Sequence, residues 1–498
     1  MKLSRKQSIL IGVFLLVYVA IKAASYFLNP TEVGDSYRYL KAGLSLTLLT
    51  YPLDEKRLPF FPLFLSLGVK FMDPIWWGRI VATVFCLGSL ILTFKISLKL
   101  FNNFKVAFFT LVLTAISPIF FYGTARVLAE GQFAFFLLLF LYFFFLKKSY
   151  ILLGVVAGLC FLTRYEGILL VSAFGLDALL SKKFRNLAFI ILGFGLIASP
   201  FVIRNILIFS DPLKSNYLIE PSGFSYNFKS VLIVVSAFLF CFGNFLVSPL
   251  LMFRSIKEYF VRYRPVFIYF VLSLLLFFFW IAAMPRLFVY LVPVFAIFTV
   301  PIFLNILSKP LLKSPLFLLS VVLNASLFVF FRTEYRYHFL VLGKWFLIIY
   351  LFFSLGSILL LVMRKLNLCL IFITISILIS SLAYTMHYRN LYQTIYKAVL
   401  FSRDLKGKIA YSDETGITSW YLVGHNTLYF DDTDGAESVD YLRSQGVKYA
   451  IVTNEFDEYR RLIFLEKKDN KNDVLLIKKF QANDGGYIRY SKVFEIIY

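Results

Sequence analysis

The chain has 498 residues, of which 60% are hydrophobic and 19% aromatic, and its formal net charge is +23. This composition excludes a soluble globular protein, because apolar runs of about 17 to 25 residues recur along the chain and match the thickness of a bilayer. The charge fits the Lys- and Arg-rich cytoplasmic loops of a polytopic membrane protein. No nucleic-acid-binding motif accompanies the charge, so nucleic acid is set aside as a partner.

The apolar runs predict an α-helical polytopic membrane protein with about 13 transmembrane helices and a cytoplasmic N-terminus. The predicted spans cover residues 8–28, 74–98, 106–122, 132–146, 151–162, 168–180, 187–203, 231–252, 266–283, 287–307, 316–331, 346–363 and 368–384. The two shortest, 151–162 and 168–180, predict a hairpin that reaches only partway into the bilayer. Residues 60–69 are apolar but short and bounded by proline, which predicts an interfacial helix. Basic residues fall on the predicted cytoplasmic side at nearly every turn, with Arg332 and Arg336 as the main exception.

The composition changes to that of a soluble domain near residue 388. We therefore predict a membrane domain over residues 1–387 and a small extracytoplasmic α/β domain over residues 388–498. Short β-rich runs alternate with a helical stretch at 436–445. The predicted strands are residues 408–412, 428–430, 449–453, 474–477 and 490–497. Because this tail has no glycine-rich phosphate loop and no triad pattern, it is interpreted as a docking or lid domain.

Cysteine and histidine give no sign of a metal site or of disulfides. The four cysteines all lie inside apolar runs and are interpreted as small core residues. The three histidines, at positions 338, 387 and 425, lie far apart and have no metal-ligand spacing.

A polar segment at residues 33–62 follows the first predicted span and carries Asp35 and Arg57. It reads as a loop on the outer side of the membrane. One interpretation is an ordinary solvated loop between two spans. The other is functional, because a carboxylate can act as a base and a cation ahead of a Pro-x-x-Pro turn can hold an anionic group.

Other charged residues share the predicted outer side. Glu130 stands at the edge of an apolar run, where an ionisable side chain is costly unless it is paired or lines a wet cavity. A structural alternative is that Glu130 pairs with Arg126 at i, i+4 and only stabilises the end of a helix. Arg286 is interpreted either as an interfacial anchor or as a clamp for phosphate, with Arg204 as a further candidate.

The succession of these motifs resembles the GT-C superfamily of polytopic glycosyltransferases, in particular the branch of protein O-mannosyltransferases and lipid A aminoarabinose transferase. The resemblance covers residues 8 to 300 approximately and rests on the order of the motifs, since no single one is specific. The motifs are Asp35 after the first span, Arg57 to Pro62, Arg126 with Glu130, Leu162 to Gly167, Pro200 to Asn205 and Arg286 to Pro293. Two features depart from the family: Asp35 is followed by Ser36 where a second acidic residue is common, and the Trp-Trp-Asp-Tyr-Gly signature of oligosaccharyltransferases is absent.

The resemblance implies transfer of one sugar from a polyprenyl- or dolichyl-phosphate donor to a hydroxyl of a glycan, lipid or protein acceptor on the extracytoplasmic face. Asp35 is then the candidate general base, and inversion at the anomeric carbon is expected. The donor phosphate is expected to bind Arg57, with Arg286 and Arg204 next in order. Glu130 is a second catalytic candidate. Tyr39, Arg126, Arg164 and Glu166 are the candidates for binding substrate. No cofactor is certain, and a divalent metal is possible but not required.

Two other classes of protein remain as alternatives. A transporter or flippase for a lipid-linked or anionic substrate would also line a path with buried charges, but such proteins commonly carry inverted repeats. The only short-hairpin region, near Thr163 to Gly167, has no counterpart in the second half of the chain. A structural assembly partner would leave Asp35 and Glu130 without a role.

Overall fold

The computed structural model describes residues 3–32, 34–52, 57–212, 256–279, 285–306, 344–363, 365–387, 389, 391–413, 416–430, 438–455, 461–467, 472–484 and 487–498. The chain divides into two compact units. Unit 1 comprises Met1–Lys22 and Ala42–Tyr384, and unit 2 comprises Ala23–Lys41 and Thr385–Tyr498. The C-terminal tail therefore forms one unit with Ala23–Lys41 near the N-terminus. The predicted domain boundary at residue 388 does not anticipate this second segment.

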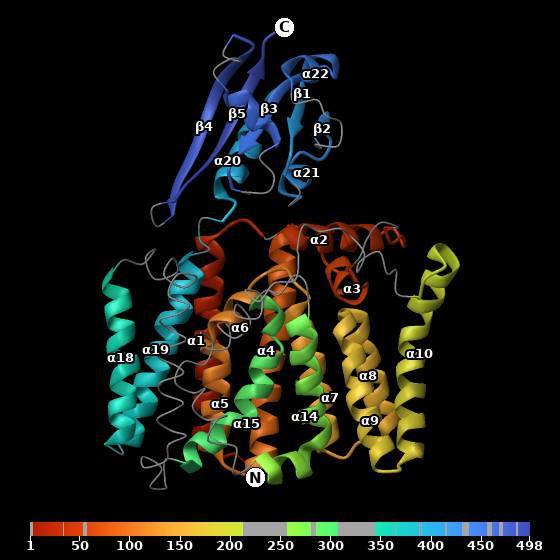
Figure 1. The fold of residues 1–498 in the computed structure, drawn as a ribbon, viewed down its shortest axis with the longest axis vertical. Helices are drawn as coiled ribbons and strands as arrows, with labels where there is room; N and C mark the ends of the chain where they lie inside the picture. Colours follow the sequence, from red (N-terminus) through yellow and green to blue (C-terminus); the bar gives the residue numbers. More distant parts are fainter. Residues whose placement is uncertain are drawn as a thin grey trace. The chain divides into compact units, whose positions relative to one another are not determined.

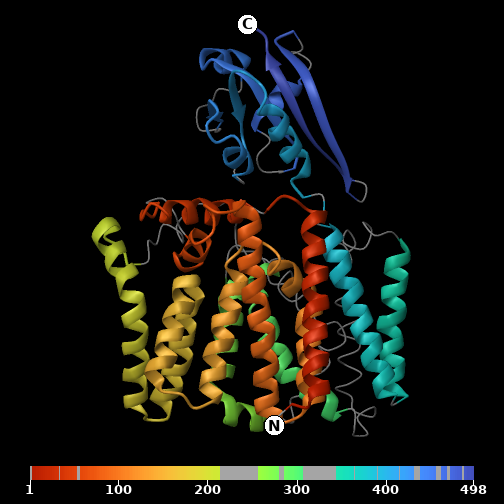
Figure 2. The same ribbon diagram turned by 180° about the vertical axis from the view of Figure 1, so that it is seen from behind.

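The chain before the tail is helical (Figures 1 and 2). Its elements are α1 (Arg5–Leu28), α2 (Gly34–Leu46), α3 (Phe60–Ser66), α4 (Pro74–Phe101), α5 (Phe104–Ile116), α6 (Pro118–Gly123), α7 (Glu130–Phe145), α8 (Tyr150–Thr163), η1 (Tyr165–Gly167), α9 (Ile168–Leu180), α10 (Phe184–Phe209), α14 (Ile256–Phe279), η4 (Pro285–Phe288), α15 (Leu291–Ile306), α18 (Lys344–Val362) and α19 (Leu366–His387). Each predicted span among the described residues coincides with helical structure. The predicted spans 231–252 and 316–331 lie outside the described residues.

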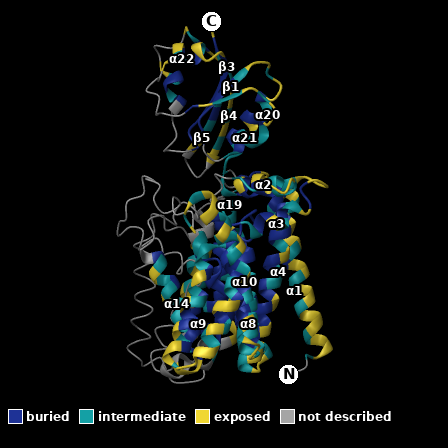
Figure 3. Ribbon diagram, turned by 90° about the vertical axis from the view of Figure 1, so that its right-hand side faces the viewer, coloured by how far each residue is buried: buried dark blue, intermediate teal, exposed yellow. Residues whose placement is uncertain are grey.

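Within the described ranges, four helical stretches are long and apolar enough to cross a membrane: Arg5–Leu28, Pro74–Phe101, Phe184–Phe209 and Asn367–Met386. Large apolar side chains such as Leu16 on α1 and Leu196 on α10 are exposed on the surface of unit 1. Figure 3 shows exposed residues along much of α1. Such a surface is stable in lipid and unstable in water. The predicted multi-span membrane fold with a small C-terminal α/β domain is confirmed.

Two local predictions are wrong. The span predicted at 106–122 is broken into α5 and α6, because Pro118 lacks a backbone N–H and Ser117 before it is extended, at φ −60° and ψ 128°. The predicted outer loop is helical over α2. Asp35 in the first turn favours the positive end of the helix, and buried residues at the spacing of Tyr37 and Leu40 form an apolar face. The density of charge on the opposite face hides this pattern in the sequence.

Helices α8 and α10 pack backbone to backbone at two glycines. A Cβ atom at Gly154 would collide with the carbonyl oxygen of Ile190, and one at Gly193 would collide with the carbonyl oxygen of Ile151. Small residues allow such close approach in membranes, where packing rather than the hydrophobic effect holds helices together. The α8–α10 contact therefore depends on the absence of a side chain at both positions.

We expect Gly193→Ala to lower the free energy of unfolding by about 1–3 kcal/mol, because two backbones must separate to admit the methyl group. The measurement is thermal unfolding of the purified protein in detergent. Gly195→Ala on the same helix is the matched control, since a Cβ there meets nothing within 4 Å. Equal stability of the two variants would contradict the packing described here.

Unit 2 contains a five-stranded mixed sheet of order β2-β1-β3-β5-β4. Its strands are β1 (Lys408–Tyr411), β2 (Thr427–Tyr429), β3 (Val447–Thr453), β4 (Val474–Asp484) and β5 (Tyr487–Ile496), and its helices are α20 (Gln393–Ser402), α21 (Ile417–Tyr421), α22 (Val439–Ser444) and η8 (Arg461–Glu466). Strand β1 is parallel to β2 and β3, whereas β5 is antiparallel to β3 and β4. Helix α20 packs against β3, β4 and β5. The structure confirms the five predicted strands and extends β4 by several residues.

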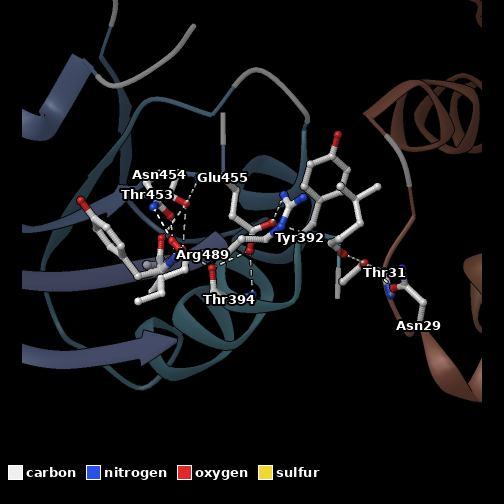
Figure 4. Close-up of polar contacts among 12 residues, drawn as sticks. Asn29, Thr31, Tyr392, Thr394, Thr453, Asn454, Glu455 and Arg489 are labelled. Carbon is white, nitrogen blue, oxygen red and sulfur yellow. Dashed lines mark hydrogen bonds and ion pairs between the residues drawn. The ribbon is translucent and has the colours of Figure 1, made fainter. Parts of the chain in front are cut away.

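A buried carboxylate joins the end of β3 to the start of α20 (Figure 4). Glu455 accepts hydrogen bonds from the backbone N–H groups of Tyr392, at 2.6 Å, and Thr394, at 2.9 Å. The Thr394 hydroxyl also donates to it, at 2.5 Å, and the guanidinium of Arg489 lies 4.0 Å away. Glu455 thus satisfies backbone donors that the first turn of a helix leaves free.

Glu455 also makes the stability of unit 2 depend on pH. Burial raises the pKa of this carboxyl, and the hydrogen bonds from Thr394 and the charge of Arg489 offset that effect only in part. A raised folded-state pKa means that the folded state binds more protons than the unfolded state. Its stabilising contribution is therefore complete below the unfolded pKa and is lost as the pH rises through the folded pKa.

Glu455→Gln keeps a hydrogen-bond acceptor in place and removes the titration. We expect the variant to gain stability relative to the native chain as the pH rises between about 4 and 7, because only the native chain loses this contribution. Thermal unfolding of both full-length proteins across this range gives the comparison. A difference between them that does not change with pH would refute the assignment.

Candidate functional site

The predicted site residues divide between the two units. Asp35 and Tyr39 belong to unit 2. The remaining candidates belong to unit 1: Arg57, Arg126, Glu130, Arg164, Glu166, Arg204 and Arg286. Each group is considered within its own unit.

The centre of unit 1 holds an arginine between two carboxylates. Arg164 lies between α8 and η1 with an extended backbone, φ −152° and ψ 143°, which ends the helix and turns its side chain inward. Its Nη1 lies 2.9 Å from Glu130 Oε1, and its Nη2 lies 2.7 Å from Glu166 Oε1. Glu130 is the first residue of α7 and is 2% exposed. The alternative pairing of Glu130 with Arg126 is therefore wrong, and Arg164 fixes the carboxylate instead.

This cluster leaves polar atoms with capacity to bind. One arginine faces two carboxylates, so the group carries a net negative charge. Glu130 Oε2 is buried and has no hydrogen-bond partner among the described residues, and the same holds for the side-chain amide of Gln132. The hydroxyls of Tyr269 and Tyr290 are also buried, they lie near Ser273 and near each other, and both are near enough to Glu166 to interact with its charge. Because buried polar groups are normally satisfied, this region suits a ligand with hydroxyl donors, or water.

Tyr51 contacts two of the residues predicted to bind phosphate. The guanidinium of Arg204 on α10 lies 5.5 Å from the ring centre of Tyr51, and its Nη2 lies 3.5 Å from the Tyr51 carbonyl oxygen. The Tyr51 hydroxyl in turn donates to the backbone carbonyl oxygen of Arg57, at 2.5 Å. The structure thus brings the guanidinium of Arg204 and the backbone of Arg57 to the same tyrosine, although the two arginines are far apart in sequence. Nothing in the sequence pattern singles out Tyr51.

The other two arginines belong to neighbouring segments of unit 1. Arg286 lies in η4, and the residues that follow it pack against α6, where a Cβ at Gly123 would lie 2.5 Å from the Val289 side chain. The guanidinium of Arg126 stands 4.8 Å from the ring centre of Tyr122. This cation–π contact gives Arg126 a partner other than Glu130.

The sequence did not lead us to predict a functional or structural role for Lys22, which is buried. Lys22 on α1 is 0% exposed, and its ammonium donates to the hydroxyl of Thr124, at 2.5 Å, with Cys86 Sγ 3.3 Å away. The sequence does contain a sign of this role, because an ionisable residue such as Lys22 is unusual inside an apolar run. Thr124 leads directly into the segment that carries Arg126 and Glu130, so Lys22 helps to hold that segment.

In unit 2, Asp35 occupies the first turn of α2 and is partly exposed, whereas Tyr39 is buried. Among the described residues of both units, no group of three or more His, Cys, Asp or Glu side chains is arranged to hold a metal ion.

Comparison with known proteins identifies the architecture. Residues 56–206 match the family model of dolichyl-phosphate-mannose-protein mannosyltransferases. No curated protein matches the sequence. The fold is similar to the crystal structure of ArnT from Cupriavidus metallidurans in the apo state, with a TM-score of 0.64 and 15% identity over 97% of this chain and 98% of that one. The structure of the same protein bound to undecaprenyl phosphate gives a TM-score of 0.62 and 14% identity over 96% of this chain and 98% of that one.

The chain has the GT-C glycosyltransferase fold. The resemblance noted in the sequence is confirmed for the architecture, and residues 56–206 are similar to the mannosyltransferase family model. The matched family segment contains Arg57, Glu130, Arg164, Glu166 and Arg204, but it begins after Tyr51. Within the GT-C fold, these clusters are the candidate site of unit 1.

The ion pair can be tested apart from activity. We expect Arg164→Gln to lower the free energy of unfolding by about 3–5 kcal/mol, because it leaves the buried Glu130 carboxylate without its cation. Glu130→Gln combined with Arg164→Gln should cost less than the sum of the two single variants, since the charge goes with its partner. Thermal unfolding of the four proteins in detergent gives the coupling, and strictly additive effects would exclude a direct pair.

Proposed function

We propose that the protein transfers a single sugar from a polyprenyl- or dolichyl-phosphate donor to an acceptor hydroxyl on the extracytoplasmic face of the membrane. Two comparisons support the donor class. The matched family is described by its use of dolichyl-phosphate-mannose, and the similar ArnT structure holds undecaprenyl phosphate. The acceptor is a glycan, a lipid or a protein.

The observation that carries the proposal is the contact of Tyr51 with both the guanidinium of Arg204 and the backbone of Arg57, which places these two segments of unit 1 side by side. A lipid phosphate needs cationic donors beside apolar surface for its tail. Guanidinium groups offer paired N–H donors that match phosphate oxygens, and unit 1 provides the apolar helices. Arg286 is the third candidate for this role. Arg164 is not proposed to bind the donor phosphate, because its guanidinium already pairs with the carboxylates of Glu130 and Glu166.

The chemistry requires one base and a good leaving group. The acceptor hydroxyl attacks the anomeric carbon, its proton passes to Asp35, and the bond from that carbon to the phosphate oxygen breaks. The lipid phosphate leaves as a stable anion, so no strong general acid is needed. Attack opposite the leaving group inverts the anomeric centre. Asp35 is partly exposed in the first turn of α2, which suits a base that must receive and release protons.

Glu130 is assigned to the substrate side of the reaction. Arg164 occupies Glu130 Oε1 and leaves Oε2 available to accept a hydrogen bond from a sugar or acceptor hydroxyl. Since the carboxylate is held rigidly, it orients the hydroxyl at little entropic cost. Arg126, Glu166 and Tyr39 are proposed to bind substrate.

The orientation in the membrane follows from charge. Lys2, Arg5 and Lys6 precede α1, and basic residues favour the cytoplasmic side. The N-terminus is then cytoplasmic, and Asp35, which follows the first span, is extracytoplasmic. The sheet of unit 2 is extracytoplasmic with it.

The test is release of radiolabelled sugar from polyprenyl-phosphate sugars by the purified protein in lipid. We expect Asp35→Asn to abolish turnover with donor binding retained, because the amide cannot accept the proton. Arg57→Ala should weaken donor binding instead, since it removes a cation from the phosphate. Arg185→Ala on the same helix as Arg204 is a control for loss of positive charge, as its cation lies over Phe189 and not at Tyr51. Full activity of Asp35→Asn would eliminate this base and leave Glu130 as the candidate.

A further inference from the structure

We propose that unit 2 positions the general base. Aromatic residues of α21 pack against the first half of α2 and so fix the part of the helix that carries Asp35. This inference rests on the proposed role of Asp35. It makes Tyr37, Trp420 and Tyr421 positioning residues, because they act on the reaction through Asp35 and do not touch the reacting atoms.

The contact between α21 and the first half of α2 is a cluster of aromatic rings. Tyr37 is 0% exposed, and its ring centre lies 6.0 Å from that of Trp420 and 6.2 Å from that of Tyr421. The ring of Tyr421 also packs on Tyr396 of α20, at 5.0 Å. Edge and tilted ring contacts of this kind are directional as well as apolar. Tyr37 is therefore part of the core of unit 2, and it lies only two residues from Asp35.

Polar contacts fix the same segment on both sides of Asp35. The Lys41 ammonium donates to the Ser419 hydroxyl, at 2.8 Å, beside Trp420. Before the helix, the Thr31 hydroxyl donates to the Leu391 carbonyl oxygen, at 2.8 Å (Figure 4). Burial raises the pKa of Tyr37 well above its usual range. The neutral phenol oxygen accepts the Glu32 backbone N–H, at 3.2 Å. The tail thus holds the segment before, within and after the first turn of α2.

The second half of α2 is fixed within unit 1. Gly43 lies directly on α3, since a Cβ there would come within 2.9 Å of Leu65 Cβ and 3.3 Å of the Pro62 carbonyl oxygen. One continuous helix therefore has its residues 34–41 packed in unit 2 and its residues 42–46 packed in unit 1. Loss of these aromatic contacts would free the first turn of α2, which carries Asp35, while residues 42–46 keep their packing in unit 1.

The test combines turnover with hydrogen exchange on the full-length protein in lipid. We expect Trp420→Ala to lower kcat by about 100-fold, the order of effect that a displacement of about 1 Å produces, with the KM for the donor unchanged. The acidic limb of the pH profile should also move, because a displaced carboxylate has new surroundings. Trp420→Phe keeps an aromatic ring and should restore most of the activity. Leu442→Ala, a core position of unit 2, is the control for general loss of stability.

Hydrogen exchange separates this inference from the function on which it rests. Trp420→Ala should speed exchange of the amides of residues 36–40 more than Leu442→Ala does, whether or not a substrate is known. Unchanged exchange there, or full activity of Trp420→Ala beside an inactive Asp35→Asn, would overturn the positioning role and leave the proposed function intact. Equal loss of activity in Trp420→Ala and Leu442→Ala would also overturn it. Full activity of Asp35→Asn would instead remove the base itself.

Discussion

A charge buried in a membrane domain must be paired, and the cluster of Glu130, Arg164 and Glu166 is built around that requirement. Arg164 forms ion pairs with one carboxylate at 2.9 Å and with a second at 2.7 Å, at the junction of α7, α8 and η1. Lipid offers no water to compensate a broken pair. The helix ends that carry these residues are therefore fixed relative to one another, and the close glycine contact between α8 and α10 supports the same region.

This pairing divides the arginines of unit 1 by task. Arg164 pairs with carboxylates, whereas Tyr51 contacts the guanidinium of Arg204 and the backbone of Arg57, the two residues proposed to bind the donor phosphate. The two clusters differ in sign: the first carries an excess of negative charge and the second of positive charge. A lipid-phosphate sugar has the same polarity, with an anionic phosphate and a neutral ring rich in hydroxyls. The distribution of charge in unit 1 thus corresponds to the two ends of the proposed donor.

The sequence predicts what depends on local pattern. The spans followed from the length of apolar runs, and the strands of the tail followed from short β-rich runs between turns, because both signals are contained in neighbouring residues. The helix α2 was missed because Arg38 and Lys41 on its exposed face obscure the apolar face at Tyr37 and Leu40. Of the candidate site, the residue types and their order were predictable. Their partners were not: the pairing of Arg164 with Glu130 joins residues 34 positions apart, and the contact of Lys41 with Ser419 joins residues 378 positions apart.

The composition of unit 2 from both ends of the chain has a consequence for biosynthesis. Residues 23–41 leave the ribosome early, yet Tyr37 gains its aromatic partners only when residues 420 and 421 have been made. The strand β5, which lies between β3 and β4 in the sheet, comes later still. While all the intervening helices are synthesised, the segment that carries Asp35 therefore lacks its partners. A nascent chain that stalls before its final strands would display an unburied aromatic segment, a feature that chaperones and proteases recognise.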